Sequence, residues 1–391
     1  MATNNNNKAL NVPHLRFPEF SGEWNKCTIN DLATVVGGGT PDTTVKSYWG
    51  GDIQWFTPSE IGKNKYVDFS LRTITRDGLD NSSAKLLPLH TILLSSRATV
   101  GECSIASNEC TTNQGFQSLI AKQCNIDFLY YLIQTKKKDL IRNACGSTFL
   151  EISANEIRKI KVAVPVQNEQ EQIAKLLSLI DERIATQNKI IEDLKKLKSA
   201  IVDKLYSSAK GETYSFRQLF EVVNEKNKKL IYSNVLSASQ ELGMIERSDI
   251  NIDIKFEQNS ISEYKIVRKG DYVVHLRSFQ GGFAFSDRTG ICSPAYTILH
   301  PNDLVAYGYL SHFFISKPFI KSLKLVTYGI RDGRSINVDE WLDMTVTLPT
   351  KREQSHILAI INAIDNKLHN ENQIHNYMFR QRTYLLKTMF I

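Results

Sequence analysis

A helix-forming segment of this chain is present twice, and this repeat constrains the fold more than any other feature of the sequence. Residues 164–206 align with residues 348–390 without a gap, at a constant offset of 184 positions. A repeat whose period is a whole domain predicts a duplicated architecture with pseudo-twofold symmetry and two similar surfaces. The matched residues are Pro165 with Pro349, Glu169-Gln170 with Glu353-Gln354, Ile173 with Ile357, Ile180-Asp181 with Ile364-Asp365, Asn188 with Asn372 and Ile190 with Ile374.

Each copy is predicted to form one long helix. A proline ends the preceding strand, and Glu169 and Glu353 lie where the positive end of a helix dipole favours an acidic side chain. The first run, from Glu169 to Tyr206, contains 38 residues. At about 1.5 Å per residue its length is roughly 57 Å. That is longer than a compact domain needs.

Apolar residues recur along both runs at spacings of three, four and seven, which is typical of a coiled-coil seam. Twofold symmetry predicts that the two helices pair antiparallel and hold globular domains at opposite ends; the alternative is that each helix packs only on its own domain. Asn188 and Asn372 lie close to the seam, where they either pin the register or face solvent. The predicted seam residues are Ile173, Leu177, Ile180, Ile184, Ile191, Leu194, Ile201, Leu205, Ile357, Ile361, Ile364, Leu368, Met378, Leu385 and Met389.

The regions before the two helices are predicted to be divergent globular domains of mixed strand and helix. In the first, a helix is predicted over 127–142, and strands at 29–36, 53–57, 91–96 and 116–121. In the second, a helical stretch interrupted near Pro318 is predicted over 307–325, and strands at 272–277 and 296–299. The predicted fold class is α+β: two pseudo-twofold domains separated by two long antiparallel coiled-coil helices. The predicted boundaries are 1–11 for a disordered tail, 12–154 and 211–340 for the domains, and 155–210 and 341–391 for the helical spacers.

Short segments of the first domain match segments of the second. Residues 93–101 align with 273–281 at an offset of 180, and 152–157 align with 336–341 at the offset of 184. The sequences diverge between these matching landmarks. This pattern favours one scaffold that carries two specificities.

The composition limits the class of protein. A chain of 391 residues with 42% hydrophobic and 23% charged residues is expected to form two soluble domains. No apolar run is long enough to cross a membrane, and the N-terminus lacks a signal-peptide profile, so a cytoplasmic protein is expected. Six cysteines without a C-x-x-C pair argue against zinc and against a disulfide framework. The net charge of +7 is compatible with a polyanionic partner.

Motifs for catalysis are missing from the sequence. There is no phosphate-binding G-x-x-x-x-G-K-[ST] loop for ATP hydrolysis, and no Asn- or Asp-Pro-Pro-aromatic motif for an amino-methyltransferase. Glu60 and Lys63 are separated by two residues, where a metal-dependent nuclease motif has one. The run 37–41, Gly-Gly-Gly-Thr-Pro, is interpreted as a tight turn or a phosphate-contacting loop. Catalysis is therefore predicted to reside in another protein.

These features together resemble the specificity (S) subunit of a type I restriction-modification system, over nearly the whole chain. The second half departs from the resemblance at 293–296, Ser-Pro-Ala-Tyr, where the first half has Asn-Gln-Gly-Phe. The motifs that carry the resemblance are 12–20 (Val-Pro-His-Leu-Arg-Phe-Pro-Glu-Phe), 38–41 (Gly-Gly-Thr-Pro), 53–56 (Ile-Gln-Trp-Phe), 95–101 (Ser-Ser-Arg-Ala-Thr-Val-Gly), 113–116 (Asn-Gln-Gly-Phe) and the duplicated Pro-x-x-x-Glu-Gln helix entry.

The resemblance implies a subunit without a catalytic site or a cofactor of its own. Each domain would read one half of a split double-stranded DNA target, and the helices would set the gap between the halves. Two modification subunits, which use S-adenosylmethionine to methylate adenine, would dock on the helices, and restriction subunits that use ATP and Mg would join them. The alternatives are a self-contained DNA-modifying or DNA-cleaving enzyme, or a coiled-coil scaffold without a role in DNA binding.

Candidate DNA contacts are polar and basic loop residues, because base edges and phosphates need hydrogen-bond donors. Arg97 and Arg277 are aligned with each other and could instead hold a turn of the scaffold. The first-domain candidates are Thr40, Ser59, Lys63, Lys65, Tyr66, Arg72, Arg76, Arg97 and Thr99. The second-domain candidates are Lys226, Lys228, Lys229, Arg277, Ser278, Gln280, Tyr328, Arg331, Asp332 and Arg334.

Overall fold

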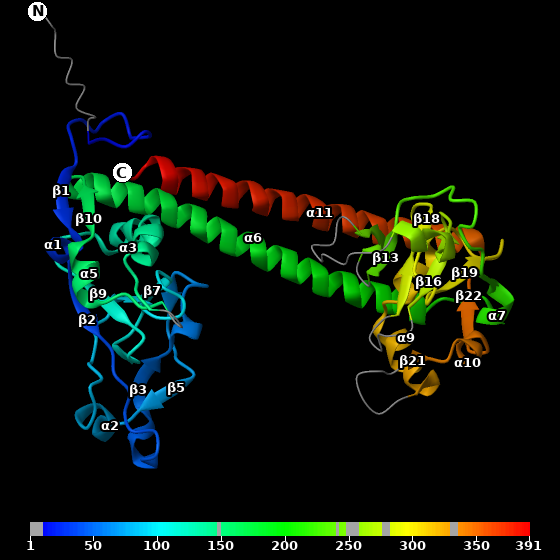
Figure 1. Cartoon of the computed structure of the whole chain (residues 1–391), viewed down its shortest axis with the longest axis horizontal. Coiled ribbons are helices and arrows are strands. Elements are labelled where there is room, and N and C mark those ends of the chain that lie inside the picture. The colour runs from blue at the N-terminus through cyan, green and yellow to red at the C-terminus, as the bar shows by residue number, and fades with distance from the viewer. Residues whose placement is uncertain (1–10, 147–149, 240–241, 248–257, 276–281, 329–334) are drawn as a thin grey trace, which may run out of the picture. The chain divides into compact units, whose positions relative to one another are not determined.

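The computed structural model of the chain divides into two compact units (Figure 1). Unit 1 consists of Met1–Gln187 with Ile374–Ile391, and unit 2 consists of Asn188–Gln373. The structure describes residues 11–146, 150–239, 242–247, 258–275, 282–328 and 335–391. Each unit thus combines one globular region with the beginning of one long helix and the end of the other.

Unit 1 contains three small sheets. The central sheet has the strand order β2-β9-β6-β7-β4, a second has β5-β3-β8, and β1 pairs antiparallel with β10. The strands are β1 (Asn25–Thr28), β2 (Ala33–Gly37), β3 (Trp49–Phe56), β4 (Tyr66–Val67), β5 (Arg72–Ile74), β6 (Ile92–Leu94), β7 (Cys103–Ala106), β8 (Cys110–Thr112), β9 (Gln117–Ala121) and β10 (Lys161–Val164). The short helices are α1 (Ile29–Leu32), α2 (Arg76–Asp80), α3 (Ile126–Thr135), α4 (Lys137–Arg142) and α5 (Ala154–Lys159).

Unit 2 repeats the central sheet in the order β12-β19-β16-β17. The register is also kept: β2 pairs Ala33 with Ala121, and β12 pairs Phe220 with Pro301. The strands are β11 (Glu212–Ser215), β12 (Phe220–Val223), β13 (Leu236–Ser239), β14 (Gly243–Glu246), β15 (Lys265–Val267), β16 (Tyr272–Val274), β17 (Phe283–Phe285), β18 (Gly290–Cys292), β19 (Thr297–Pro301), β20 (Thr327–Tyr328), β21 (Ser335–Ile336) and β22 (Thr345–Leu348). The short helices are α7 (Phe216–Leu219), α8 (Tyr309–Phe313), α9 (Lys317–Ser322) and α10 (Val338–Leu342).

Several predicted element boundaries are wrong for local reasons. Residues 29–32 form helix α1 instead of strand, because Thr28 and Asp31 make a capping box in which the Asp31 carboxylate accepts the Thr28 amide at 2.8 Å. The helix predicted over 127–142 is two helices, interrupted at Lys136. The stretch 307–325 is interrupted, as predicted near Pro318: it contains α8 and α9, and Ser316 starts the second helix as its N-cap. Of the predicted strand 272–277, the last two residues lie outside the described residues.

The two long helices are α6 (Gln167–Ser207) and α11 (Lys351–Thr388). Their ends belong to the cores: Leu177 and Leu385 lie in the apolar cluster of unit 1, and Val202 and Ile361 lie in that of unit 2. Every predicted seam residue is buried or half-buried. The long helices therefore contribute to both cores, which the linear domain boundaries predicted above do not describe.

The structure distinguishes between the two alternatives for the polar residues predicted near the seam. Asn188 and Asn372 are exposed, which agrees with the solvent-facing alternative. Gln187 and Glu371, also related by the offset of 184, are the buried polar residues at this level of the helices.

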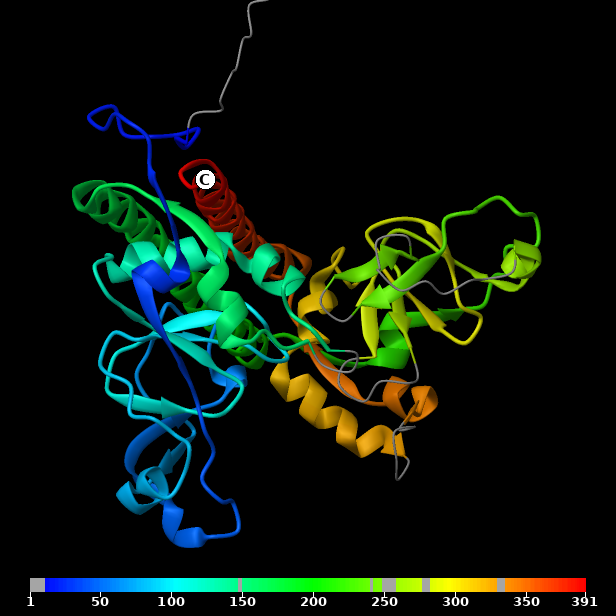
Figure 2. The same cartoon turned by 60° about the vertical axis from the view of Figure 1, so that its left-hand side comes forward.

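The N-terminal segment lies beside the C-terminal end of α11 in both views of unit 1 (Figures 1 and 2). The Leu15 amide donates to the Thr388 carbonyl at 2.9 Å, and the Phe390 ring stacks on Phe128 of α3. Asn11, the last residue of the predicted tail, bonds with Trp24 through both its side chain and its backbone. Residues 1–10 lie outside the described residues.

Two leucines on α6 test the contribution of the helix ends to the cores. Leu177 is 0% exposed and Leu179 is 49% exposed. We expect Leu177→Ala to reduce the free energy of unfolding of unit 1 by about 2–5 kcal/mol, because it leaves a cavity in the core. Leu179→Ala should change it by less than about 0.5 kcal/mol. Thermal and urea unfolding measure both; equal losses would contradict the packing.

Candidate nucleic-acid interface and its anchors on the long helices

Four sequence motifs meet in unit 1 around the glycine-rich turn. The Gly38 amide donates to the Phe116 carbonyl at 3.4 Å, and the Gly39 amide donates to the Thr112 carbonyl at 2.8 Å. A Cβ atom at Gly38 would lie 2.0 Å from the Asn113 carbonyl oxygen, so only glycine fits. The indole of Trp55 donates to the Gly39 carbonyl at 2.9 Å. Both glycine amides donate within the protein and are therefore not available to a phosphate. This favours the interpretation of the run as a tight turn over that of a phosphate-contacting loop.

Polar side chains gather over this turn. The Thr40 hydroxyl bonds with the Gln114 side chain, and Arg97 and Pro58 flank Gly115. We call Thr40, Ser59, Arg97, Thr99 and Gln114 the motif surface. Gln114 is part of the Asn-Gln-Gly-Phe motif and was missed as a candidate, although its amide can both donate to and accept from a base edge.

Within the motif surface, Arg97 and Thr99 also make contacts inside unit 1. The Arg97 guanidinium lies 3.8 Å from the Glu151 carboxylate, with both side chains about half exposed. The Thr99 hydroxyl lies 2.9 Å from the Ser95 hydroxyl. Both residues are exposed, so these contacts orient them without removing them from solvent.

Three further first-domain candidates are exposed. The Arg72 guanidinium stacks over the Trp49 ring, 3.7 Å from its centroid. Arg76 pairs with Asp80 at 3.3 Å in α2, and Lys63 extends from the loop after β3. The stacking restricts Arg72 to one orientation while leaving its donors accessible.

Lys65 and Tyr66 are occupied by internal contacts. Both side chains bond with the Asp127 carboxylate at 2.7 Å, and the Lys65 ammonium also donates to the Ser178 hydroxyl of α6 at 2.5 Å. Burial, followed by the hydrogen bond to Asp127, raises the pKa of Tyr66 above its ordinary value. Lys65 therefore connects the globular part of unit 1 to the long helix, and Tyr66 shares the Asp127 carboxylate with it.

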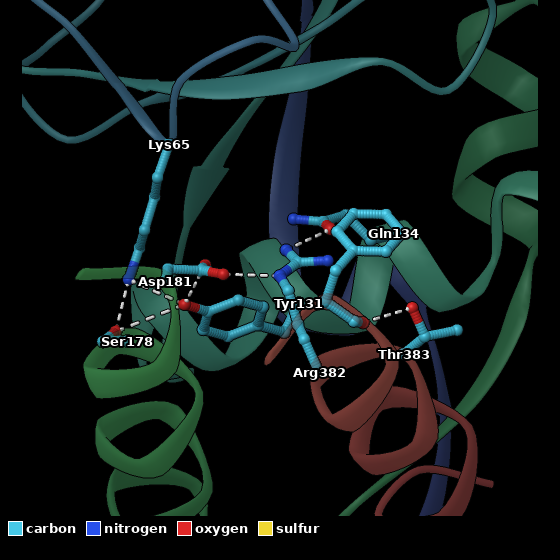
Figure 3. Close-up of polar contacts among 8 residues, drawn as sticks. Lys65, Tyr131, Gln134, Ser178, Asp181, Arg382 and Thr383 are labelled. Atoms are coloured by element: carbon cyan, nitrogen blue, oxygen red, sulfur yellow. Dashed lines mark hydrogen bonds and ion pairs between the residues drawn. The ribbon is translucent and has the colours of Figure 1, made fainter. Parts of the chain in front are cut away.

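A second group of contacts with α6 centres on Asp181 (Figure 3). Its carboxylate accepts the Tyr131 hydroxyl of α3 at 2.7 Å and pairs with the Arg382 guanidinium of α11. Arg382 also donates to the Gln134 side chain at 2.9 Å. Burial raises the pKa of Tyr131, so its hydroxyl stays protonated and donates. One carboxylate therefore joins three helices.

Unit 2 contains an equivalent cluster. The Asp365 carboxylate of α11 pairs with the Lys198 ammonium of α6 at 2.5 Å and lies 4.0 Å from His312 of α8. Asp365 and Asp181 differ by 184 positions, and so do Arg382 and Lys198. The acid is on α6 in unit 1 and on α11 in unit 2. In each unit the acid therefore lies on the long helix that begins there, and the base lies on the long helix that ends there.

The duplicated glutamines start both long helices in the same way. The Gln170 and Gln354 side chains are buried, and each donates to the carbonyl of the proline five residues before it, at 3.0 and 2.8 Å. Gln170 accepts the Asn125 amide at 3.0 Å, and Gln354 accepts the Ala306 amide at 2.7 Å. The repeated Pro-x-x-x-Glu-Gln pattern therefore connects each helix entry to the globular part of its unit.

The duplicated glutamates differ. Glu169 is 0% exposed and accepts two bonds from Arg16, at 2.7 and 2.8 Å, and a third from the Trp24 indole at 3.3 Å. Glu353 is exposed and accepts the Thr350 amide at 3.0 Å and its hydroxyl at 2.7 Å, and these bonds lower the pKa of Glu353. Sequence reasoning placed both acids at helix starts but missed Arg16, which lies in the opening motif.

The second-domain candidates are described only in part. Lys226 pairs with Glu263 at 2.6 Å, and Lys228 and Lys229 are exposed. Tyr328 pairs through its backbone with Ser335. The remaining candidates lie outside the described residues: Arg277, Ser278, Gln280, Arg331, Asp332 and Arg334.

The departure of the second half from the motif preserves the turn. In unit 1 the Gly115 amide donates to the Asn113 side chain at 2.8 Å. In unit 2 the Ala295 amide donates to the Ser293 hydroxyl at 3.3 Å. Ser293 follows Asn113 by the offset of 180, so a hydroxyl replaces the carboxamide as the acceptor.

The described residues contain neither a candidate metal site nor a candidate membrane-spanning helix. There, no group of three or more His, Cys, Asp or Glu side chains could hold a metal ion, and the six cysteines are free. In the same part of the chain, no helix combines the length and the apolarity needed to span a membrane.

Known proteins with similar sequences are named as specificity subunits of type I restriction enzymes. Residues 21–196 match the family described as the type I restriction modification DNA specificity domain. The type I restriction enzyme MjaIX specificity subunit of Methanocaldococcus jannaschii is 39% identical over 183 residues, which are 45% of this chain and 42% of that protein. The EcoR124I/EcoR124II specificity subunit of Escherichia coli is 29% identical over 216 residues, or 51% of this chain and 52% of that protein. The chain thus matches about half the length of these curated relatives.

Solved structures resemble the whole chain. The type I restriction-modification S subunit from M. genitalium has a TM-score of 0.55 at 16% identity and covers 97% of this chain and 99% of that one. A chain solved in work on complex assembly and conformational transition of the type I R-M system has a TM-score of 0.63 at 12% identity and covers 94% and 97%. At these identities the likeness shows the fold.

His312 makes the stability of unit 2 depend on pH. Burial, followed by the charge of Lys198, lowers the pKa of His312 to about 4 from its ordinary value of 6.5, while Asp365 acts in the opposite direction. Between pH 6.5 and 4 the unfolded chain therefore binds a proton that the folded chain does not, so stability falls as the pH falls, by at most about 3 kcal/mol. His312→Gln should flatten this dependence in urea unfolding. The exposed-histidine control His356→Gln should keep it; an unchanged slope in His312→Gln would contradict the assignment.

Arg382 tests the Asp181 cluster. Arg382→Lys keeps the positive charge beside Asp181 but loses the bond to Gln134, so we expect unit 1 to lose about 1–2 kcal/mol of unfolding free energy. Arg380→Lys, an exposed position two residues away on α11, should change it by less than about 0.5 kcal/mol. Thermal unfolding distinguishes the two variants, and identical transitions would show that the cluster adds no stability.

Proposed function

We propose, from the match of residues 21–196 to the type I restriction modification DNA specificity domain and from the similarity to type I specificity subunits, that this chain is the non-catalytic DNA-reading subunit of such a system. Each globular part would recognise one half of a bipartite double-stranded target. The observation that carries the proposal is the pair of equivalent clusters around Asp181 and Asp365. They attach two divergent domains to a common helical frame in equivalent ways, and this arrangement suits two readers of different sequences.

In this proposal the predicted boundaries acquire separate roles. Residues 12–154 and 211–340 read DNA, and residues 155–210 and 341–391 set the gap between the half-sites. Because the ends of both helices belong to the two cores, the middle of each helix determines that gap.

We assign DNA contacts in the first domain to the motif surface and to Lys63, Arg72 and Arg76. The stacked Arg72 suits a base edge, because a guanidinium of fixed orientation can donate two parallel bonds to guanine. Lys63 suits phosphates, which accept any suitably placed cation. Lys65 and Tyr66 are assigned to anchoring instead, since Asp127 and Ser178 engage them.

In the second domain we retain Lys226, Lys228 and Lys229 as phosphate contacts. Arg277, Ser278, Gln280, Tyr328, Arg331, Asp332 and Arg334 stay predictions from the sequence.

Modification subunits are proposed to dock on the long helices. Apolar side chains that the helices leave exposed support this role, because charged helix faces would otherwise be expected there. In unit 1 they are Leu179, Ile374, Tyr377, Phe379 and Tyr384, and in unit 2 they are Ile190 and Leu197. The docked subunits would supply S-adenosylmethionine-dependent methylation, and restriction subunits would add the ATP- and Mg-dependent reactions, while this chain binds no cofactor.

Two alternatives make different predictions. A self-contained enzyme would form product when the chain alone is incubated with labelled S-adenosylmethionine, or with Mg²⁺ and plasmid. A coiled-coil scaffold would bind no duplex DNA even within a complete complex. Neither alternative explains why the two globular parts diverge while their helix anchors are shared.

The test uses the chain assembled with its modification subunits. We expect methylome sequencing of a host that carries the complete system, and footprinting of the assembly, to give two half-sites separated by a constant gap. A continuous site, or none, would contradict the proposal. Arg72→Ala should relax discrimination at one base pair of a single half-site by about tenfold to 100-fold. Arg142→Ala, an exposed arginine of α4, should leave both half-sites unchanged.

A further inference from the structure

A turn in unit 2 presents two large aliphatic side chains to solvent. Leu230 and Ile231 are 64% and 65% exposed, and they directly follow Lys228 and Lys229. Within the part of the chain that the structure describes, neither lysine forms an ion pair. The nearby acids are engaged elsewhere: Glu263 pairs with Lys226, and Glu225 pairs with Arg268. The turn is therefore both basic and apolar.

The turn is rigid despite its exposure. Asn227 is 1% exposed, and its side chain donates to the Tyr232 carbonyl at 2.7 Å and accepts the Tyr232 amide at 3.3 Å. Its carbonyl accepts the Leu230 amide at 2.9 Å, and its amide donates to the Tyr264 carbonyl at 2.9 Å. A turn fixed in this way loses little conformational entropy when it binds a partner.

The backbone at Leu230 is strained, and the hydrogen bonds of Asn227 hold it in this conformation. Its φ angle is +54°, in the left-handed region that glycine and asparagine tolerate and leucine disfavours. The exposed Leu230 side chain contributes little to a core that could compensate. Strain of this kind, held in place by the surrounding structure, is concentrated at binding and active sites.

The position of the turn points to the ligand. The turn follows β12, which matches β2 at an offset of 187 with the same register to the neighbouring strand. At that offset Asn227 corresponds to Thr40 of the motif surface. The two units therefore place candidate DNA contacts on loops that leave equivalent strand ends.

We propose that Leu230 and Ile231 form an apolar wedge that inserts between base pairs of the half-site read by unit 2, while Lys228 and Lys229 contact the flanking phosphates. Aliphatic wedges of this kind unstack a base step from the minor groove and kink the duplex. The flanking lysines favour DNA over a protein surface as the occupant, because phosphates require cations. This inference depends on the proposed DNA-reading function.

The test uses the chain assembled with its modification subunits and duplexes that carry 2-aminopurine at successive positions of both half-sites. We expect 2-aminopurine fluorescence to rise on binding at one step of a single half-site. Leu230→Asn should abolish this rise and weaken specific binding roughly tenfold, the effect of removing one buried leucine from an interface. Because asparagine tolerates the positive φ, the variant should unfold at the same or a higher temperature.

Two comparison variants separate the parts of the wedge. Lys228→Ala combined with Lys229→Ala should reduce the slope of log affinity against log salt by about 2, whereas Leu230→Asn should leave the slope unchanged. Leu242→Asn replaces another leucine of unit 2, 71% exposed in the β13–β14 turn, and should behave as the wild type.

The outcomes distinguish the wedge from the function on which it depends. Wild-type affinity and fluorescence in Leu230→Asn would overturn the wedge alone. Loss of modification-subunit binding by this variant, with DNA unstacking unchanged, would also overturn it and make the turn a protein contact. A wild-type assembly that binds no bipartite duplex would overturn the proposed function together with the wedge.

Discussion

The ion pair between α6 and α11 is the interaction on which the rest of the structure depends. It occurs once in each unit, as Asp181 with Arg382 and as Asp365 with Lys198, with acid and base exchanged between the helices. A partly buried carboxylate needs a matched cation, because an uncompensated charge there would be strongly destabilising. The pairs therefore fix the antiparallel register of the helices, and Tyr131 and His312 connect that register to the globular part of each unit.

The two units share this pair of helices but differ in the contacts that attach the helices to the globular part. Unit 1 adds Tyr131, Gln134 and the fully buried Glu169 held by Arg16, whereas unit 2 relies on His312 and on the exposed cap of Thr350. The surfaces carried by the frame also differ: unit 1 has polar side chains and stacked Arg72, and unit 2 has the basic and apolar turn at 228–231. A common frame with different surfaces is the arrangement expected of two readers that share partners but not targets.

Prediction from the sequence succeeded where patterns were local and failed where partners were distant. The family inferred from the motifs and the α+β class agree with the relatives and solved structures that the chain resembles. The seam residues are buried or half-buried, since their periodicity is a property of each helix alone. Lys65 is a predicted DNA contact whose ammonium donates to the Ser178 hydroxyl of α6, a contact that the sequence did not indicate. Its partner Ser178 is 113 residues away, and no local pattern encodes that contact.

The sequence by itself determined the duplication, the two long helices and their apolar faces, because repeat offsets and helical periodicity are written directly in residue order. Only the tertiary structure decided which polar residues hold the frame and which remain available to a ligand. Arg382 and Arg380 are two positions apart on one helix, yet only Arg382 faces the Asp181 carboxylate, 201 residues away in the chain. The availability of a charge depends on what folding brings beside it, because a partly buried carboxylate is strongly destabilising unless a cation lies beside it.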